Sequence, residues 1–565
     1  MNTDSALVSV ARPLKSRTIR TDHAVCLVAG VLPATWARLV LVGLALAFVV
    51  LGATDLDLGP LEARLGLAAG ERLGPLGQVF GYWAPDLWPA QVFPSILLAQ
   101  FEPLGRPSSA AVRWPAALAG IIAGWVLARR MSRALGIRAG VLVGICWFSS
   151  LALIDRSGES GLDLILGLAT LATIDHLMAR GSDLVAGLWA SLAFLAGGWP
   201  PLVVIGLAII VLGRTAMDFS WRLLLPPFLT AVLWSLWTCW SATTEAWAAA
   251  LTLPLTQKPS WFLGLGVLAL GLPWSPFAFL ALAPSVREGW KPDGRRWVNG
   301  WFQVAIASLV AGTFVPGLSQ ASRVVALAGW TVGTAACLES AWTRLLSRSV
   351  RRAFLVLFSG VTGLWLCVMI YGAYIWTLSL SYYRMLGVVM SLLVLVVAYL
   401  AWSALVNHNS RRGLITLFVI AAGLKLVHWG YYVPEWNYRY SQGPWARAIA
   451  QWMPRRWTLY TIHDWPEDLA FFTKRRVRQL RSPHYLEYQP GPESKYVLLL
   501  PSELENWPRS APPVSVVAKF QDQSAAERVL VRTAGILPPP FGPNPSRLSL
   551  GGRNGAPPAQ RTVRQ

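Results

Sequence analysis

Carboxylates gather in two short segments that border long apolar runs, and these side chains are the best candidates for chemistry. One segment follows the apolar run 35–53, and the other, residues 155–163, follows the third apolar run. Together they hold Asp55, Asp57, Glu62, Glu71, Asp86, Asp155, Glu159 and Asp163. A carboxylate at a lipid–water boundary can act as a general base or hold a divalent metal ion. Simple solvation of an external loop explains the same pattern, and spacing alone slightly favours it.

Basic residues stand close to these acids. Glu62 and Arg64 follow Pro60, and a proline in a first turn with a glutamate behind it is an ordinary helix start. The same two side chains could equally anchor an anionic phosphate substrate and its attacking hydroxyl. Arg156 and Asp163 lie at the ends of two apolar runs, where they could pair as a structural tether or belong to the same site.

The sequence lacks the compact motifs of several other enzyme classes. It contains no P-loop, no HExxH metal motif and no nucleophile elbow. Its five cysteines form no CxxC pair, and its histidines, among them His176 and His463, have no partner at ligand spacing. No cofactor is therefore expected with certainty, and a divalent metal ion held by loop carboxylates is the one candidate.

The composition indicates that lipid is the main solvent of the chain. Of 565 residues, 54% are hydrophobic and only 14% are charged, whereas a soluble protein has roughly a quarter of its residues charged. The formal net charge of +21 does not indicate nucleic-acid binding, because the basic residues cluster between apolar segments, as the positive-inside rule predicts. We therefore predict an integral membrane protein whose partners include membrane lipids and no nucleic acid.

Basic and poorly basic loops alternate along the chain, and this alternation predicts its topology. Residues 1–35 form a basic cytoplasmic segment, and residues 36–430 form an all-helical membrane domain with about thirteen transmembrane helices. The first external loop covers about residues 54–109. An odd number of spans places the C-terminal region outside the cytoplasm. Two glycine pairs of the GxxxG type, Gly120/Gly124 and Gly140/Gly144, predict close helix packing.

The last part of the chain has the composition of a soluble domain. Residues 431–535 alternate short apolar strand patterns with helical ones, which predicts a small α/β domain, and residues 536–565 read as a disordered tail. The predicted strands are 457–461, 496–500, 514–520 and 529–532, and the predicted helices are 466–473 and 502–507.

The order of several short motifs resembles that of a known family. "GPLEARLGLAAGERL" follows the first span, Arg113 opens the second in "AAVRWPAALAG", and Asp163 opens the fourth in "GLDLILGLATLATIDHLMARG". The hairpin "LAFLAGGWPPLVVIGL" and the proline-broken "LGLPWSPFAFLAL" come next. In this order the motifs resemble the GT-C glycosyltransferases, of the bacterial protein-mannosyltransferase and aminoarabinose-transferase type.

The resemblance implies a GT-C membrane domain with an α/β domain outside the cytoplasm of a bacterial inner membrane. It also implies inverting transfer of a sugar from a polyprenyl-phosphate donor to a lipid, protein or glycan acceptor at the outer face. The general base would be an acid of the first loop, with Glu62, Asp55, Asp57 and Asp163 as the candidate catalytic residues. Basic side chains near the membrane surface would hold the carrier phosphate, and the candidates are Arg64, Arg113, Arg156 and Lys258.

The sequence departs from the family pattern at positions that bear on catalysis. Leu61 stands where the family has the first acid of an Asp-Glu pair, and Gly197 replaces the lysine of the hairpin. Either the base has moved to a neighbouring acid, or the protein is a catalytically silent relative that binds lipid-linked sugar or scaffolds an envelope complex. A transporter is a further alternative, but the acids lie mainly at the outer boundary rather than at the membrane midplane.

Overall fold

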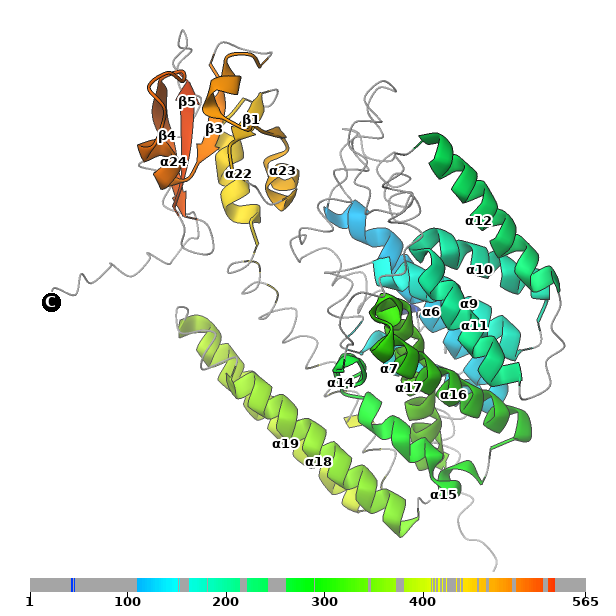
Figure 1. Ribbon diagram of the computed structural model, residues 1–565. Coiled ribbons are helices and arrows are strands. Elements are labelled where there is room, and N and C mark those ends of the chain that lie inside the picture. Colours follow the sequence, from blue (N-terminus) through cyan, green and yellow to red (C-terminus); the bar gives the residue numbers. More distant parts are fainter. Residues whose placement is uncertain are drawn as a thin grey trace, which may run out of the picture.

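The computed structural model consists of a helical body and a small mixed β-sheet (Figure 1). It describes residues 109–150, 162–213, 221–241, 261–371, 381–407 and 441–533, with short gaps inside these ranges and a few isolated positions outside them. The predicted N-terminal segment 1–35, the first external loop 54–109 and the tail 536–565 lie outside the described residues, except for Ser109 at the end of the loop.

An antiparallel helix pair opens the described bundle. α6 (Ser109–Leu135) turns at Gly136 into α7 (Ile137–Phe148), and Gly136 has a φ of 111°, which favours glycine. A Cβ at Gly124 would lie 2.6 Å from the side chains of Trp147 and Phe148. The indole Nε1 of Trp147 donates to the carbonyl of Gly120 at 2.9 Å. The predicted role of the first glycine pair in helix packing is therefore confirmed.

Four described helices follow, and three of them pack closely together. α9 lies against α6, α10 and α11, and α10 also lies against α12. The turn between α10 and α11 needs Gly198, whose φ of 76° is a conformation that side chains rarely allow. In chain order these helices are α9 (Leu162–Met178), α10 (Asp183–Gly197), α11 (Trp199–Gly213) and α12 (Trp221–Ser241).

A broken helix and a central helix complete the core. α14 (Leu263–Leu270) and the 3-10 helix η2 (Ser275–Leu282) are bent by 104° at the proline-containing break between them. α15 (Pro284–Arg287) and α16 (Pro292–Phe314) follow, and η3 (Pro316–Leu318) leads into α17. α17 (Ser319–Thr343) packs against α16, α7, α9 and η2, so it lies at the centre of the bundle.

Two long helices lie side by side beyond this core (Figure 1). They are α18 (Arg348–Tyr371) and α19 (Ser381–Val406). The ring of Phe354 in α18 lies 4.6 Å from that of Phe277 in η2, which connects the pair to the core. The guanidinium of Arg351 donates to the carbonyl of Val406, so the start of α18 is joined to the end of α19.

Within the described residues, α17 is long and apolar enough over Ser319–Ala341 to cross a membrane. The bent pair α14–η2 would be a second span if it is counted as one. Shorter apolar segments of 10–17 residues lie in α7, α9, α10 and α11, and within the longer helices α12 and α19. The helical body and the small sheet are confirmed, while the number of about thirteen spans remains a prediction.

The C-terminal unit is a five-stranded sheet of order β2-β1-β3-β5-β4. β1 pairs in parallel with both β2 and β3, whereas β5 pairs antiparallel with β3 and β4. The strands are β1 (Thr458–Thr461), β2 (Arg476–Gln479), β3 (Tyr496–Leu499), β4 (Val514–Gln521) and β5 (Glu527–Thr533). The helices are α22 (Gly443–Trp452), α23 (Glu467–Thr473), η6 (Pro483–Leu486) and α24 (Pro501–Glu505).

Each face of this sheet carries its own apolar cluster. Leu459, Tyr496 and Leu498 pack with α22 and α23 on one face. Tyr460 and Val497 face the other way and pack with Leu486 of η6 and with residues around α24. The four predicted strands and two predicted helices are present within one or two residues of their expected ends. β2 and α22 were not predicted.

Candidate functional site

Most of the site residues expected from the sequence lie outside the described residues. These are Asp55, Asp57, Glu62, Arg64, Arg156 and Lys258. Asp163 is the second residue of α9, and its backbone alone is described. Arg113 is the expected site residue whose side chain the structure describes.

Arg113 lies near the start of α6, and its side chain is among the largest that are fully buried, with 1% of the residue exposed. Burying a guanidinium costs several kcal/mol unless other groups compensate its charge and hydrogen-bonding capacity. Arg113 does interact with other groups. The fold therefore compensates a buried arginine near the beginning of α6.

An ion pair at the far end of the same helix orients α9. Arg130 of α6 donates from Nε to Oδ2 of Asp175 in α9 at 2.7 Å. Arg113 precedes Arg130 by seventeen residues, or about 26 Å of helix, and Asp163 precedes Asp175 by twelve residues, or about 18 Å. The pair lies near the last turn of both helices, so an antiparallel pair would scarcely overlap. Because α6 and α9 nevertheless pack together, they run in parallel and begin at the same end of the bundle, which we call the Arg113 end. The backbone of Asp163 belongs to that end.

The hairpin between α10 and α11 also reaches the Arg113 end. A Cβ at Gly197, the last residue of α10, would lie 2.6 Å from the side chain of Leu166, one turn beyond Asp163 in α9. A Cβ at Gly167 would lie 2.3 Å from Val324, in the second turn of α17. The motif around Asp163, the hairpin and the beginning of α17 are therefore neighbours in space.

Hydroxyl groups and an indole are also buried toward this end. α7 runs antiparallel to α6, and the buried Ser149 and Ser150 follow its last residue. The Nε1 of Trp274, in the break between α14 and η2, donates to Oγ of Ser149 at 2.7 Å. Oγ1 of Thr334 in α17 donates to the carbonyl of Trp274 at 2.9 Å. The proline-broken motif is thus fixed to α7 and α17 by buried hydrogen bonds.

Polar residues that the sequence analysis did not single out connect helices at the opposite end. Asp175 is 1% exposed and pairs with Arg130, and Glu339 of α17 lies 3.8 Å from Arg138 of α7. An acid inside an apolar run is rare in membrane helices and marks an interior position. That signal was present in the sequence "ATLATIDHLM". Because Asp175 pairs with Arg130, it is a structural tether rather than a free acid.

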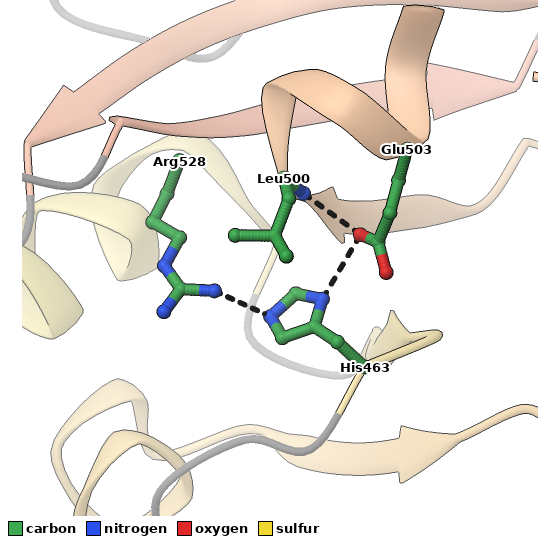
Figure 2. A network of polar contacts seen from close by, with 4 residues as sticks. All are labelled: His463, Leu500, Glu503 and Arg528. Carbon is green, nitrogen blue, oxygen red and sulfur yellow. Dashed lines mark hydrogen bonds and ion pairs between the residues drawn. The ribbon is translucent and has the colours of Figure 1, made fainter. Parts of the chain in front are cut away.

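A second polar network lies in the C-terminal unit (Figure 2). Nδ1 of His463 is 3.0 Å from Oε2 of Glu503, and Nε2 is 2.9 Å from Nη1 of Arg528. The backbone N–H of Leu500 also donates to Oε2 of Glu503, at 2.8 Å. Because a guanidinium is only a donor, Nε2 accepts, and Nδ1 must carry the proton that it donates to Glu503. The geometry therefore assigns a neutral imidazole.

This network lies where the direction of strand connections changes. β1 connects outward to β2, and the chain then crosses back to β3 on the other side of β1. Ligands of open α/β sheets often bind beyond the carboxyl ends of strands at such a point. His463 follows β1, and Glu503 lies in α24, directly after β3. The second ring nitrogen of His463, however, already contacts Arg528, as Figure 2 shows. The network therefore connects the segment after β1 with α24 and β5. The imidazole of His463 is not left free to act as a base.

Burial changes the acidity of two tyrosines in this sheet. The pKa of Tyr460 and the pKa of Tyr496 are both raised by burial, and the nearby Arg478 and Arg532, respectively, oppose the rise. Both phenols therefore stay neutral at ordinary pH. The described residues contain no group of three His, Cys, Asp or Glu side chains that could hold a metal ion. The metal expected in the first loop lies outside the described residues and stays a prediction.

Two solved structures share the fold of this chain over nearly its whole length. One is ArnT from Cupriavidus metallidurans bound to undecaprenyl phosphate, with a TM-score of 0.68 and 17% sequence identity; the match covers 91% of this chain and 100% of that one. The other is the same protein in the apo state, with a TM-score of 0.65, 19% identity and coverages of 88% and 98%. No protein-family profile and no curated protein matches the sequence. The structural match confirms the predicted GT-C fold.

Proposed function

We propose that this chain, which has the GT-C fold, transfers a sugar from a polyprenyl-phosphate carrier to a lipid, protein or glycan acceptor. The observation that carries this proposal is the extent of the likeness to ArnT, a structure that holds undecaprenyl phosphate. The match covers 91% of this chain, and the 9% left over is shorter than the C-terminal unit 441–533, so that unit has a counterpart at least in part. The membrane would be a bacterial inner membrane, with about thirteen spans, the N-terminus in the cytoplasm and the C-terminal unit outside.

The proposed reaction needs one base and one site for the carrier phosphate. The base removes the acceptor proton as the acceptor oxygen bonds to the anomeric carbon from the face opposite the leaving group. The bond from that carbon to the phosphate oxygen breaks, and polyprenyl phosphate leaves. We assign the base to Glu62, with Asp55 and Asp57 as the nearest alternatives, and Asp163 to the same site.

Basic side chains would compensate the charge that grows on the departing phosphate. The proposed set is Arg64, Arg113, Arg156 and Lys258. Support comes from Arg113, a buried cation at the end of the bundle where α9 begins and the α10–α11 hairpin turns. Because the side chain of Arg113 is buried in this structure, a phosphate could contact it only inside the helical bundle and not from the surface.

One observation favours a second candidate function. Gly197 stands where the family pattern has a lysine, and it packs so closely on Leu166 that any side chain there would displace that leucine. The space that a lysine would need is thus filled by apolar packing. Together with Leu61, this supports a silent relative that binds the lipid-linked sugar without transferring it.

A single preparation separates the two candidates. The full chain is placed in lipid nanodiscs with undecaprenyl-phosphate sugars that carry a radiolabel, and with envelope lipid and glycan fractions as acceptors. Native mass spectrometry measures bound carrier, and chromatography measures label that has moved to an acceptor. Nanodiscs without the protein are the control.

The proposed enzyme binds at least one carrier and moves its label to an acceptor with repeated turnover. Binding without any movement of label would establish the silent relative instead. Absence of carrier binding across the whole panel would contradict both candidates.

A further inference from the structure

One edge of the C-terminal sheet combines basic side chains with exposed tyrosines. β2 is the outermost strand and pairs only with β1, and η6 follows it directly. We call residues 474–488, which include both elements, the basic edge. Its first eight residues, "KRRVRQLR", contain five basic residues and no acid.

The charges of the basic edge are only partly used inside the fold. Arg475 donates to the carbonyls of Ala450 and Met453, at 3.0 and 2.9 Å, and so joins the end of α22 to the end of α23. Arg478 and Arg481 are exposed to solvent. One acid lies in the stretch, Glu487, which interacts electrostatically with Lys495. An excess of positive charge therefore faces outward.

Two tyrosines extend this surface. Tyr485 is 50% exposed and Tyr488 is 78% exposed, and the other large apolar side chain described as exposed in this unit is Val516, on β4. The exposure of the tyrosines does not come from a loose loop, because Leu486 between them is fully buried. Nζ of Lys495 also donates to the carbonyl of Leu486. The fold thus holds both phenol rings at the surface.

We propose that the basic edge docks on anionic phospholipid headgroups of the membrane that carries the helical body. Arginine side chains are attracted by lipid phosphate, and tyrosine is enriched at the headgroup level because its ring is apolar and its hydroxyl is polar. The sheet is also tethered: α22 begins 37 residues after the end of α19. Because the edge belongs to the same chain as the helical body, it stays at high effective concentration near the lipid surface.

Hydrogen exchange of the full chain in nanodiscs tests this docking. One preparation contains only zwitterionic phosphatidylcholine, and the other contains phosphatidylglycerol in addition. We expect backbone amides of residues 474–488 to exchange several-fold more slowly in the anionic nanodiscs. High salt should remove the difference because it screens the charges. The peptide that covers β3 exchanges equally in both preparations, which shows that the sheet stays folded.

Two variants decide whether the edge itself makes the contact. The double variant Arg478→Gln/Arg481→Gln loses the lipid-dependent protection, whereas Arg509→Gln, which removes an exposed charge of the same unit beyond α24, keeps it. Equal exchange in the two lipids would overturn the proposal. If the edge were equally protected in both lipids, its contact would be with protein instead. Loss of protection in Arg509→Gln would also overturn the proposal.

Discussion

His463 illustrates how single residues of this protein acquire a role through contacts that are distant in sequence. Its ring joins Glu503, 40 residues away, and Arg528, 65 residues away. Sequence spacing gave no sign of either partner, because helical or strand periodicity connects only near neighbours. Arg113 and Asp163 could be singled out from motif order, since each stands at the start of an apolar run.

The first prediction concerns this network. His463→Gln removes the donor to Glu503 and leaves a charged group partly buried with fewer partners. We expect the opening free energy of the C-terminal unit to fall by about 1.5–3 kcal/mol, the usual size for a hydrogen bond to a charged group. Hydrogen exchange of β1 and β3 in the full chain measures it.

His484→Gln is the matched control, since His484 is exposed on η6. It should leave exchange in β1 and β3 unchanged. If the two histidine variants behaved alike, the network would not fasten the sheet.

At the scale of elements, the described helices agree with the apolar runs of the sequence, and their boundaries follow from glycine and proline. Gly136 and Gly198 end helices through backbone conformations that other residues avoid. β2 escaped prediction because "RVRQ" has one apolar residue and its strand character depends on pairing with β1. Such an edge strand has no alternation to detect.

The ion pair between α6 and α9 supports the second prediction. Asp175→Asn and Arg130→Gln each leave one partner unpaired, and removing one partner of a buried pair costs roughly 3–5 kcal/mol. Because Arg130 is partly exposed, the loss for Asp175→Asn should be at the low end of that range. Thermal unfolding of the purified protein in detergent, followed by loss of the monodisperse peak, measures both.

Arg133→Gln is the control for charge, because Arg133 is exposed in the same helix. The double variant Asp175→Leu/Arg130→Met should recover much of the lost stability, since an apolar pair avoids the desolvation cost. If Arg133→Gln lowered the unfolding temperature as much as Arg130→Gln, the ion pair between Arg130 and Asp175 would not stabilise the bundle more than any other charge of α6.

At the scale of the whole molecule, motifs that are far apart in sequence converge on one end of the bundle. Gly197 packs on Leu166, close to Asp163, and Arg113 lies at the same end of the parallel helix α6. Motif order alone predicted the GT-C fold, which the likeness to ArnT confirms. It could not predict that apolar packing fills the position of the hairpin lysine, because that depends on a contact between α9 and α10.

Single-turnover transfer by Glu62→Gln tests the central claim most directly. The variant keeps the shape of Glu62 and removes the charge, while Glu71→Gln makes the same change elsewhere in the first external loop. We predict that Glu62→Gln slows transfer at least about a hundredfold, as expected for loss of a general base, and still binds the carrier. Glu71→Gln should transfer at the unmodified rate. Normal transfer by Glu62→Gln would contradict the assignment of the base to this residue.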